Sequence, residues 1–139
     1  MLKLDETKYN DYLISNDKKL LSLEKIYEFL SKSYWANNRT KEVINESIKN
    51  SECYGIYLDN NQVGFARLVT DYSVMYWLCD VYIDVKHRKK GLGKKLMETI
   101  IKNDQLINLT GILGTKDAHQ LYEKYGFVNA QGFMRRKVE

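Results

Sequence analysis

The sequence predicts a single domain of the α+β class, in which a mixed sheet of seven strands packs with four helices. Apolar runs of strand length alternate along the chain with stretches of helical periodicity. One of these helices lies between two apolar strands, as in the right-handed crossover that joins parallel neighbours. A length of 139 residues allows one core without a metal or disulfide staple. Because no linker, repeat or low-complexity tract divides the chain, residues 1–139 are expected to fold as one unit.

The N-terminal part is expected to form one strand and two helices. Residues 9–14 have the pattern of a short strand. Ser22 is a good helix cap, and the apolar residues after it follow helical spacing over 23–30. Thr40 caps a second helix in the same way, which ends near residue 50.

Three strands are expected to follow as an antiparallel meander. The apolar runs at 53–58 and 63–70 flank the pair Asn60-Asn61. Asparagine tolerates the positive φ that a tight hairpin turn demands, so these runs predict a hairpin. Residues 75–85 form the next strand of the pattern, antiparallel to the one before it.

A crossover is predicted after the meander. A helix over 92–102 follows the strand over 75–85, and an apolar strand over 106–113 comes next. This arrangement places the loop between the first two elements at the carboxyl end of a parallel pair. Ligands usually bind at that end of a sheet.

The C-terminal part is expected to add a short helix and two strands. The helix covers residues 117–125 and ends at Gly126, a residue suited to a left-handed helix stop. Residues 127–128 and 133–138 are predicted to be the final strands of the sheet. These strands offer an edge for a second copy, so a homodimer is an assembly that the pattern allows.

Composition argues against a nucleic-acid partner. Hydrophobic residues make up 44% and charged residues 29% of the chain, as in ordinary soluble domains. The net charge of +4 is too small to indicate a nucleic-acid binder. The helix over 92–102 also carries Leu, Met and Ile on the face where a recognition helix needs polar side chains.

The sequence favours a cytoplasmic protein without a membrane segment or a metal. No stretch resembles a leader peptide, and no apolar run approaches the ~18 residues of a membrane span. Cys53 and Cys79 lie in apolar runs and have no His or Cys at metal-ligand spacing. Both are therefore expected to be buried thiols in a reducing compartment.

The segment before the helix over 92–102 has the features of an anion-binding site. Gly91 and Gly93 lack a Cβ, so a phosphate can approach the main chain, where unpaired amides and the positive end of the helix dipole converge. The basic side chains around them are His87, Arg88, Lys89, Lys90, Lys94 and Lys95. The residues that define a P-loop or a dinucleotide fingerprint are missing. A polyphosphate ligand is expected, and the alternative is a solvated basic turn.

Two motifs resemble those of a known family. Arg88-x-x-Gly91-x-Gly93 follows one strand, and Ala118-x-x-Leu121-Tyr122-Glu123-Lys124-Tyr125-Gly126-Phe127 follows the next. In this order they resemble the GNAT superfamily of acetyl-CoA-dependent N-acetyltransferases, and the element order resembles that fold from about residue 9 to the end. The resemblance implies a GNAT-like acyl-CoA N-acyltransferase fold, with acetyl-CoA as co-substrate and no metal.

The resemblance also implies which residues hold the coenzyme. The backbone amides of residues 89–94 would bind the pyrophosphate, and the main chain of 82–85 would pair with the pantetheine arm like an added strand. Thr115 stands where relatives often have an asparagine that touches the pantetheine, so that contact is weaker or is made by the hydroxyl. The coenzyme-binding residues implied in this way are Tyr82, Ile83, Val85, Arg88, Lys89, Lys90, Gly91, Leu92, Gly93, Lys94 and Thr115.

Acetyl transfer to an amine needs proton transfer. A lysine-like ammonium has a pKa of ~10.4, so removing its proton at neutral pH adds about 4 kcal/mol to the barrier unless a base assists. Asp80 matches the position of that base in many relatives, and its alternative is a sheet-edge carboxylate that pairs with a cation. Tyr122 matches the general acid that protonates the departing thiolate, and its alternative is packing against a strand. The N–H of Val81 is the candidate donor to the carbonyl oxygen, and His119 is either a proton shuttle or a surface residue.

The amine acceptor is expected to meet the polar and aromatic loop at 33–39. The candidate wall residues are Trp35, Arg39, Arg67 and Tyr72, with Tyr76 and Trp77 beside them. The alternative is that the tryptophans belong to the core and the arginines to the surface. No motif identifies the acceptor, so a small-molecule amine and a protein or peptide amine are both open.

The function expected from these residues is N-acetyl transfer by direct attack of the amine within a ternary complex. The alternative is a non-catalytic module that binds acyl-CoA. Such a module is expected to lose the acid or the base, and this chain keeps Asp80 and Tyr122. The sequence therefore favours the enzyme.

Overall fold

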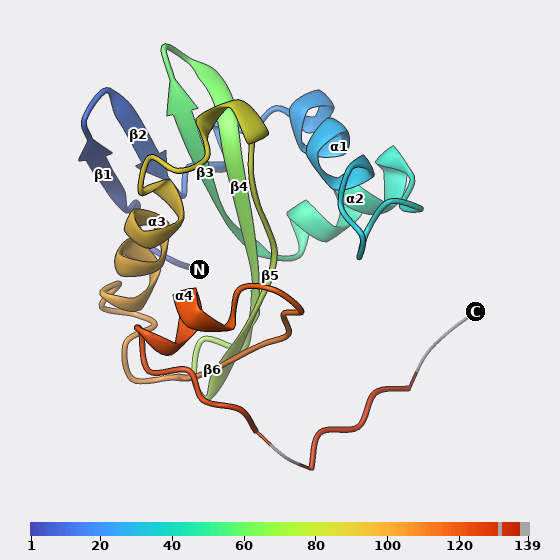
Figure 1. Cartoon of the computed structure of the whole chain (residues 1–139), viewed down its shortest axis with the longest axis vertical. Coiled ribbons are helices and arrows are strands. Elements are labelled where there is room, and N and C mark those ends of the chain that lie inside the picture. The colour runs from blue at the N-terminus through green and yellow to red at the C-terminus, as the bar shows by residue number, and fades with distance from the viewer. Residues whose placement is uncertain (131, 137–139) are drawn as a thin grey trace.

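The computed structural model describes residues 1–130 and 132–136, and in it one mixed sheet has helices on both faces (Figure 1). Within these residues the strands are β1 (Glu6–Tyr9), β2 (Tyr12–Ser15), β3 (Glu52–Leu58), β4 (Asn61–Thr70), β5 (Met75–Ile83) and β6 (Thr110–Leu113). They lie in the sheet in chain order. From β1 to β5 each strand is antiparallel to the next, whereas β5 and β6 run parallel. The predicted α+β class and the crossover are confirmed.

The first two of the four helices in the described chain begin at the caps that the sequence indicates. The helices are α1 (Leu23–Ser31), α2 (Lys41–Lys49), α3 (Leu92–Ile101) and α4 (His119–Glu123), with the 3-10 turns η1 (Lys18–Leu20) and η2 (Val85–His87). Ser22 Oγ accepts the N–H of Lys25 at 3.2 Å, and Thr40 Oγ1 accepts that of Val43 at 3.2 Å. In the part of the chain described, no helix is long and apolar enough to cross a membrane.

The sheet divides the core into two clusters. On one face α3 buries its apolar side against Tyr54, Leu68 and Leu78 of the sheet. On the other face α1 and α2 bury apolar side chains against Cys53 and Phe65. Each large apolar side chain buried in this way contributes about 1.5–3 kcal/mol, which fixes both layers against the strands. Because helices cover both faces of the sheet, the strand ends and the gaps between strands are the places where a ligand can reach the sheet.

The first strand predicted from the sequence is wrong in its extent. Residues 6–15 form a hairpin of β1 and β2 rather than one strand over 9–14. The turn includes Asn10, whose φ of +53° is the left-handed conformation that asparagine tolerates. No glycine or proline marks this turn in the sequence, so the pattern of apolar residues alone did not indicate it.

The last part of the predicted sheet also differs from the structure. Residues 127–130 and 132–136 form no strand, and residues 137 and 138 of the final predicted strand lie outside the described residues. The described chain therefore has six strands where seven were predicted, and it shows no terminal strand for the suggested homodimer. α4 is likewise shorter than the helix predicted over 117–125.

β6 begins at Thr110, four residues later than the predicted strand over 106–113. Leu106 lies instead in the turns that follow α3, where its N–H donates to the carbonyl of Asn103 at 3.0 Å. Its side chain is 1% exposed. The apolar character of this segment therefore reflects core packing at the end of α3 rather than strand pairing.

Candidate active site

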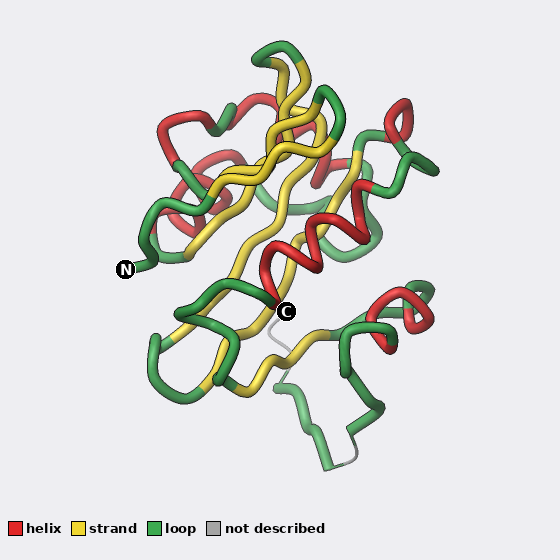
Figure 2. The backbone as a smooth tube through the Cα atoms, turned by 90° about the vertical axis from the view of Figure 1, so that its left-hand side faces the viewer, coloured by secondary structure: helices red, strands yellow, loops and turns green. Residues whose placement is uncertain are grey.

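β5 has a strand partner on both sides over only part of its length. β6 pairs with residues 75–78 of β5, whereas residues 79–83 pair only with β4 in the described chain. β6 ends at Leu113, and the chain then leaves the sheet toward α4 (Figure 2). A strand edge without a neighbour presents backbone groups with which an extended ligand can pair. The second half of β5 offers such an edge.

A β-bulge interrupts β5 at this place. Ala66 of β4 lies opposite both Asp80 and Val81, because the register between the two strands shifts there. Asp80 has a φ of +54°, a left-handed conformation that costs roughly 1–2 kcal/mol in a residue with a Cβ. Bulges re-aim side chains, leave one residue outside the regular ladder and are frequent next to active sites. Val81, whose N–H was the candidate donor to the carbonyl oxygen, belongs to this bulge.

The loop before α3 leaves consecutive backbone amides without an acceptor. No described residue accepts a hydrogen bond from the amides of 89–94, and Lys95 is the first to donate, to Gly91 O at 3.0 Å. Lys89 and Gly91 have φ values of +65° and +82°. Alternation of left-handed and right-handed residues turns successive N–H groups toward one point, and the dipole of α3 adds positive potential there. This is the geometry of an anion-binding site.

The two glycines of the loop are needed for different reasons. Gly91 has positive φ, and a Cβ built on it would lie 2.6 Å from the hydroxyl of Tyr9. A Cβ on Gly93 would meet nothing closer than Leu121 Cδ2 at 3.7 Å. The fold therefore requires glycine at position 91, whereas at position 93 the fold leaves room for a side chain. The room at Gly93 is available to a ligand.

Arg88 is tied to the end of β5. Its Nε donates to the carbonyl of Ile83 at 2.9 Å, and its guanidinium lies 5.1 Å from the centre of the Tyr82 ring. Tyr82 in turn stacks on Phe29 of α1 at 5.3 Å. Arg88 thus joins the loop to the strand end and to α1, while the loop lysines 89, 90 and 94 are exposed around the free amides.

The hairpin of β1 and β2 supports the same loop, a contact that was not predicted from the sequence. Tyr9 Oη donates to the carbonyl of Lys90 at 3.0 Å. Tyr12 Oη and His87 Nδ1 lie 2.8 Å apart. His87 and the Lys90 carbonyl are therefore held from the hairpin. The pair Asn10-Asp11 between β1 and β2 is the signal from which the hairpin could have been expected.

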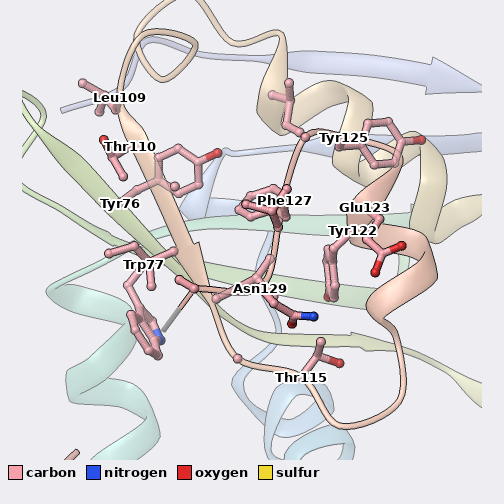
Figure 3. A pocket seen from close by; sticks show the side chains of 18 of the residues that line it. Tyr76, Trp77, Leu109, Thr110, Thr115, Tyr122, Glu123, Tyr125, Phe127 and Asn129 are labelled. Carbon is pink, nitrogen blue, oxygen red and sulfur yellow. The ribbon is translucent and has the colours of Figure 1, made fainter. Parts of the chain in front are cut away.

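Tyr122 of α4 is buried and lines a cavity of about 710 Å³. Tyr76 and Trp77 lie on the other side of this cavity, and Thr115 lies at one end (Figure 3). Burial raises the pKa of the Tyr122 phenol, with smaller contributions from Asp117 and Tyr34. The phenol therefore stays protonated across the neutral range, as a proton donor must.

The cavity does not include the anion-binding loop. Its lining residues come from the end of α3, from β6, from α4 and from the segment after α4, with Tyr76 and Trp77 of β5. Thr115 Oγ1 accepts the N–H of Ala118 at 3.1 Å, which helps to start α4. The hydroxyl of Thr115 keeps its own proton for another acceptor. His119 is exposed at the first position of α4.

Asp80 lies at the centre of a polar cluster that contains three of the predicted acceptor residues. Trp35 Nε1 donates to its Oδ1 at 3.0 Å, and Arg39 Nη1 and Arg67 Nε donate to its Oδ2 at 2.8 Å each. Arg67 Nη1 also donates to Ser51 Oγ at 3.0 Å. The Asp80 side chain is 1% exposed. The geometry shows Asp80 paired with two cations, and its role as a base stays a prediction.

Tyr72, the fourth predicted acceptor residue, has a different partner. It lies in the turn between β4 and β5, and its hydroxyl donates to Glu52 Oε2 at 2.5 Å. This hydrogen bond raises the pKa of Tyr72 to about 12. Glu52 is buried beside Ser51, so the pair adjoins the Asp80 cluster without a direct bond to the carboxylate. Nothing in the sequence distinguished Ser51 or Glu52 from ordinary strand-flanking residues.

The described residues hold no group of three or more His, Cys, Asp or Glu side chains placed as metal ligands. Cys53 is buried and Cys79 is half-buried, and both are free thiols. Burial raises the pKa of Cys53 to about 12 and that of Cys79 to about 11. Thiols with raised pKa values are poor nucleophiles near neutral pH.

Comparisons with known proteins agree with this geometry. A crystal structure of a candidate GNAT-family acetyltransferase from Xanthomonas campestris pv. campestris has a TM-score of 0.89 and 34% identity, with 94% of this chain and 96% of that chain covered. A GNAT family acetyltransferase from Elizabethkingia anophelis, solved with acetyl-CoA bound, shares the fold at a TM-score of 0.67 and 19% identity, with 88% and 80% covered.

A curated relative matches a shorter stretch. A candidate acetyltransferase from Gibberella zeae is 27% identical in an alignment 110 residues long, which covers 65% of this chain and only 62% of that protein's length. A family model described as an acetyltransferase (GNAT) domain matches residues 49–129. That stretch contains the bulge of β5, the loop of free amides and Tyr122. The resemblance expected from the two motifs is thus confirmed, and the chain belongs to the GNAT family of acetyltransferases.

Proposed function

We propose that this protein transfers the acetyl group of acetyl-CoA to a primary amine by direct attack within a ternary complex. The observation that carries the proposal is the run of free amides at 89–94 next to the unpaired edge of β5 at 79–83. Acetyl-CoA combines a diphosphate with an extended arm that contains amides. The loop suits the first part and the strand edge suits the second.

The donor side of this proposal uses mostly backbone groups. The amides of 89–94 bind the diphosphate, and Lys89, Lys90 and Lys94 supply charge around it. The main chain of 82–85 pairs with the pantetheine arm, and the Thr115 hydroxyl is free to donate to it. The relative from Elizabethkingia anophelis that was solved with acetyl-CoA bound supports this choice of ligand.

In the reaction, the amine nitrogen forms a bond to the thioester carbonyl carbon, and the carbon–sulfur bond then breaks. The Val81 N–H at the bulge stabilises the negative oxygen of the tetrahedral intermediate. Tyr122 gives its proton to the departing thiolate. Both oxygens of Asp80 already accept hydrogen bonds, so in this scheme the amine attacks in its neutral form and water, rather than Asp80, takes the proton that leaves the nitrogen. Water then returns a proton to the Tyr122 phenolate, so that the amide and free coenzyme A are the products.

The proposal is tested first by ligand binding. Acetyl-CoA at concentrations well above its Kd is expected to raise the Tm by several degrees, because a ligand that binds only the folded state stabilises it. A short duplex DNA of the same charge serves as control and is expected to give no shift. A chain that shows no shift with acetyl-CoA contradicts the proposal.

A non-catalytic acyl-CoA-binding module is the second candidate, and the occupied carboxylate of Asp80 is the observation that favours it. The two candidates differ in the release of free thiol. A panel of amines that includes polyamines, amino acids, aminoglycosides and peptide N-termini is incubated with acetyl-CoA and the protein, and the thiol is titrated. Thiol release with at least one amine supports the enzyme, whereas binding without release supports the module.

A further inference from the structure

We infer that Asp80 is a positioning residue that holds the loop at 33–39 across the gap between β5 and β6, where this loop forms the wall for the amine acceptor. The loop connects α1 to α2 and contains no regular helix or strand. The kinetic consequence of this role for Asp80 rests on the proposed acetyl transfer, whereas the structural consequence does not. The inference gives Asp80 a role other than the base expected from the resemblance.

The bonds of Asp80 leave little capacity for proton transfer. An ionised carboxylate has about four acceptor sites, and here three donors occupy sites on both oxygens. Two of the donors are guanidinium groups, whose hydrogen bonds to a carboxylate are charge-assisted and strong. The Asp80 side chain is 1% exposed, and donors of the protein face both of its oxygens. A general base must instead have an oxygen within hydrogen-bond reach of the substrate proton that it abstracts.

The same bonds determine where the loop lies. Trp35 and Arg39 come from the loop, and both bind Asp80, which belongs to the bulge of β5. At another point of the loop, Tyr34 Oη accepts the N–H of Lys116, which follows β6. The Lys116 ammonium also lies 4.6 Å from the centre of the Tyr34 ring. The loop is thus attached to both strands that separate at the site.

The loop offers groups to a ligand as well as to the fold. The Tyr34 and Trp35 rings meet edge to face at 4.9 Å and are 49% and 40% exposed. The Arg39 side chain is 30% exposed and uses one guanidinium nitrogen for Asp80. Aromatic faces and spare N–H groups are the usual lining of a pocket for a small polar molecule. Release of the loop should therefore weaken the binding of the amine and leave the binding of acetyl-CoA unchanged.

The bulge and the loop depend on each other. Asp80 adopts its left-handed φ while its carboxylate is held by Trp35, Arg39 and Arg67. The charged and titratable groups that face it are Arg39 from the loop, Arg67 from β4 and Cys79 from its own strand. Only the arginines are charged at neutral pH. Removal of the Asp80 charge would leave two guanidinium groups together and push the loop away.

The first test measures the loop directly and needs no substrate. The chain has two tryptophans, so Trp77→Phe leaves Trp35 as the single reporter and keeps a ring where Trp77 stacks on Phe133. In this background Asp80→Asn is expected to shift Trp35 emission to the red and to raise its acrylamide quenching by roughly twofold, because the loop opens. Asp104→Asn removes one charge from an exposed position after α3 and is expected to change neither quantity.

Arg39→Gln is the second variant, and it removes the loop side of the ion pair while Asp80 stays. Arg39 is partly exposed, so this variant is expected to fold. It should produce the same red shift and the same increase in quenching as Asp80→Asn. If Trp35 emission and quenching are unchanged in both variants, the inference is overturned, whatever the protein does with acetyl-CoA.

The kinetic test separates a positioning residue from a base. With the amine that gives the fastest thiol release in the panel, Asp80→Asn and Arg39→Gln are both expected to lower kcat/KM for the amine by roughly tenfold to a hundredfold through KM, with KM for acetyl-CoA unchanged. The double variant should lose no more than the worse single variant, since both act through one bond. If Asp80 is the base, Arg39→Gln frees its carboxylate, so turnover holds or rises while Asp80→Asn alone is slow. That result overturns the inference.

Discussion

The proposed coenzyme side of the site consists largely of backbone, whereas the proposed acceptor side consists of side chains. On the proposed coenzyme side, residues 79–83 have a strand partner only in β4, and the amides of 89–94 have no acceptor among the described residues. On the acceptor side, Trp35, Arg39 and Arg67 meet around the buried carboxylate of Asp80. A backbone site recognises a group that all members of a family share, and a side-chain site can change with the acceptor. The difference explains why the sequence could place the backbone groups together, whereas it named Trp35, Arg39 and Arg67 without showing that they meet at Asp80.

The largest effect is expected for the side chain that acts on the coenzyme sulfur. Tyr122→Phe removes the proton donor and should lower kcat by roughly 10²–10⁴-fold, while the Tm shift with acetyl-CoA stays at the wild-type value. The dependence of kcat on pH is a second test of this role. Burial raises the Tyr122 pKa, so the donor is protonated at neutral pH and is lost only as pH rises through that pKa, and the variant should lack this alkaline decline.

Tyr27→Phe on α1 is the matched control for Tyr122→Phe, because it also removes one phenol oxygen but lies on the opposite face of the sheet. Its turnover should equal that of the wild type. If Tyr122→Phe and Tyr27→Phe have equal kcat values, the thiolate leaves without a protein donor and the proposed role of Tyr122 is wrong.

The second prediction concerns the glycine that the fold itself requires. Gly91→Ala should lower the free energy of unfolding by about 1–3 kcal/mol and should lower the affinity for acetyl-CoA. The reason is that position 91 has φ of +82° and the new Cβ meets the Tyr9 hydroxyl. Gly126→Ala is the control, since Gly126 has φ of +89° with no atom within 4 Å of an added Cβ. Urea unfolding of both variants measures the difference.

That difference isolates the contact with Tyr9. In the Tyr9→Phe background, Gly91→Ala should recover part of its lost stability, because the hydroxyl that the Cβ meets is gone. Equal losses for Gly91→Ala and Gly126→Ala in the wild-type background would show that Tyr9 moves aside freely. The Tyr9 hydroxyl would then set no steric limit at position 91.

The third prediction separates binding from folding on the coenzyme side. Gly93→Glu should lower the affinity for acetyl-CoA by about tenfold, because its carboxylate lies where the phosphates are proposed to bind. High salt should reduce this loss, because it screens the repulsion between the carboxylate and the phosphates. The same carboxylate lies at the N-terminal turn of α3, where it is favourable by about 0.3–1 kcal/mol, so the stability of the free protein should hold or rise. Gly93→Gln, which has the same shape without the charge, should weaken acetyl-CoA less. Equal affinities for the two variants would mean that the phosphates bind elsewhere.

The sequence predicted what depends on local pattern. The caps Ser22 and Thr40 and the crossover from β5 to β6 appear as expected. The hairpin of β3 and β4 also forms, but its turn is Asp59-Asn60, with φ of +49° and +67°, rather than the predicted Asn60-Asn61, because Asn61 already pairs with Leu58. The free amides of 89–94 lie where the two glycines indicated them. Each of these features is determined by residues that are close together in the chain.

Features that depend on distant contacts were not predictable in the same way. The coil that holds Leu106 and the absence of strands over 127–130 and 132–136 carry no local signal. The turn at Asn10-Asp11 has turn-forming residues, but the prediction treated them as part of one strand. The bonds of Asp80 join residues 41 and 45 positions apart, so the sequence could name each partner without placing them together. Ser51 and Glu52 owe their place in the network to the register of β3 with β4 alone.

The smallest effect tests the sheet beneath the acceptor side. Cys53 faces Arg67 across β3 and β4, and its thiol stays protonated in the folded protein up to a pKa of about 12, whereas an unfolded thiol ionises near 9.0. Below about pH 9 both states are protonated and this group adds no pH dependence. Above it the unfolded state loses a proton, so stability falls as pH rises, by on the order of 1 kcal/mol per pH unit. Cys53→Ala should therefore flatten the decline of urea stability between about pH 9 and pH 11.

Cys79→Ala provides the comparison, because Cys79 on β5 has a smaller rise in pKa, to about 11. Both variants leave small cavities that lower stability at neutral pH, so the slope against pH is the informative quantity rather than the absolute value. The slope should decrease over a wider pH range for Cys53→Ala than for Cys79→Ala. Unchanged slopes would mean that water reaches both thiols in the folded protein. The sheet beneath the proposed acceptor side would then be less tightly packed than the proposed coenzyme side. That result is the reverse of what the burial of Asp80 implies.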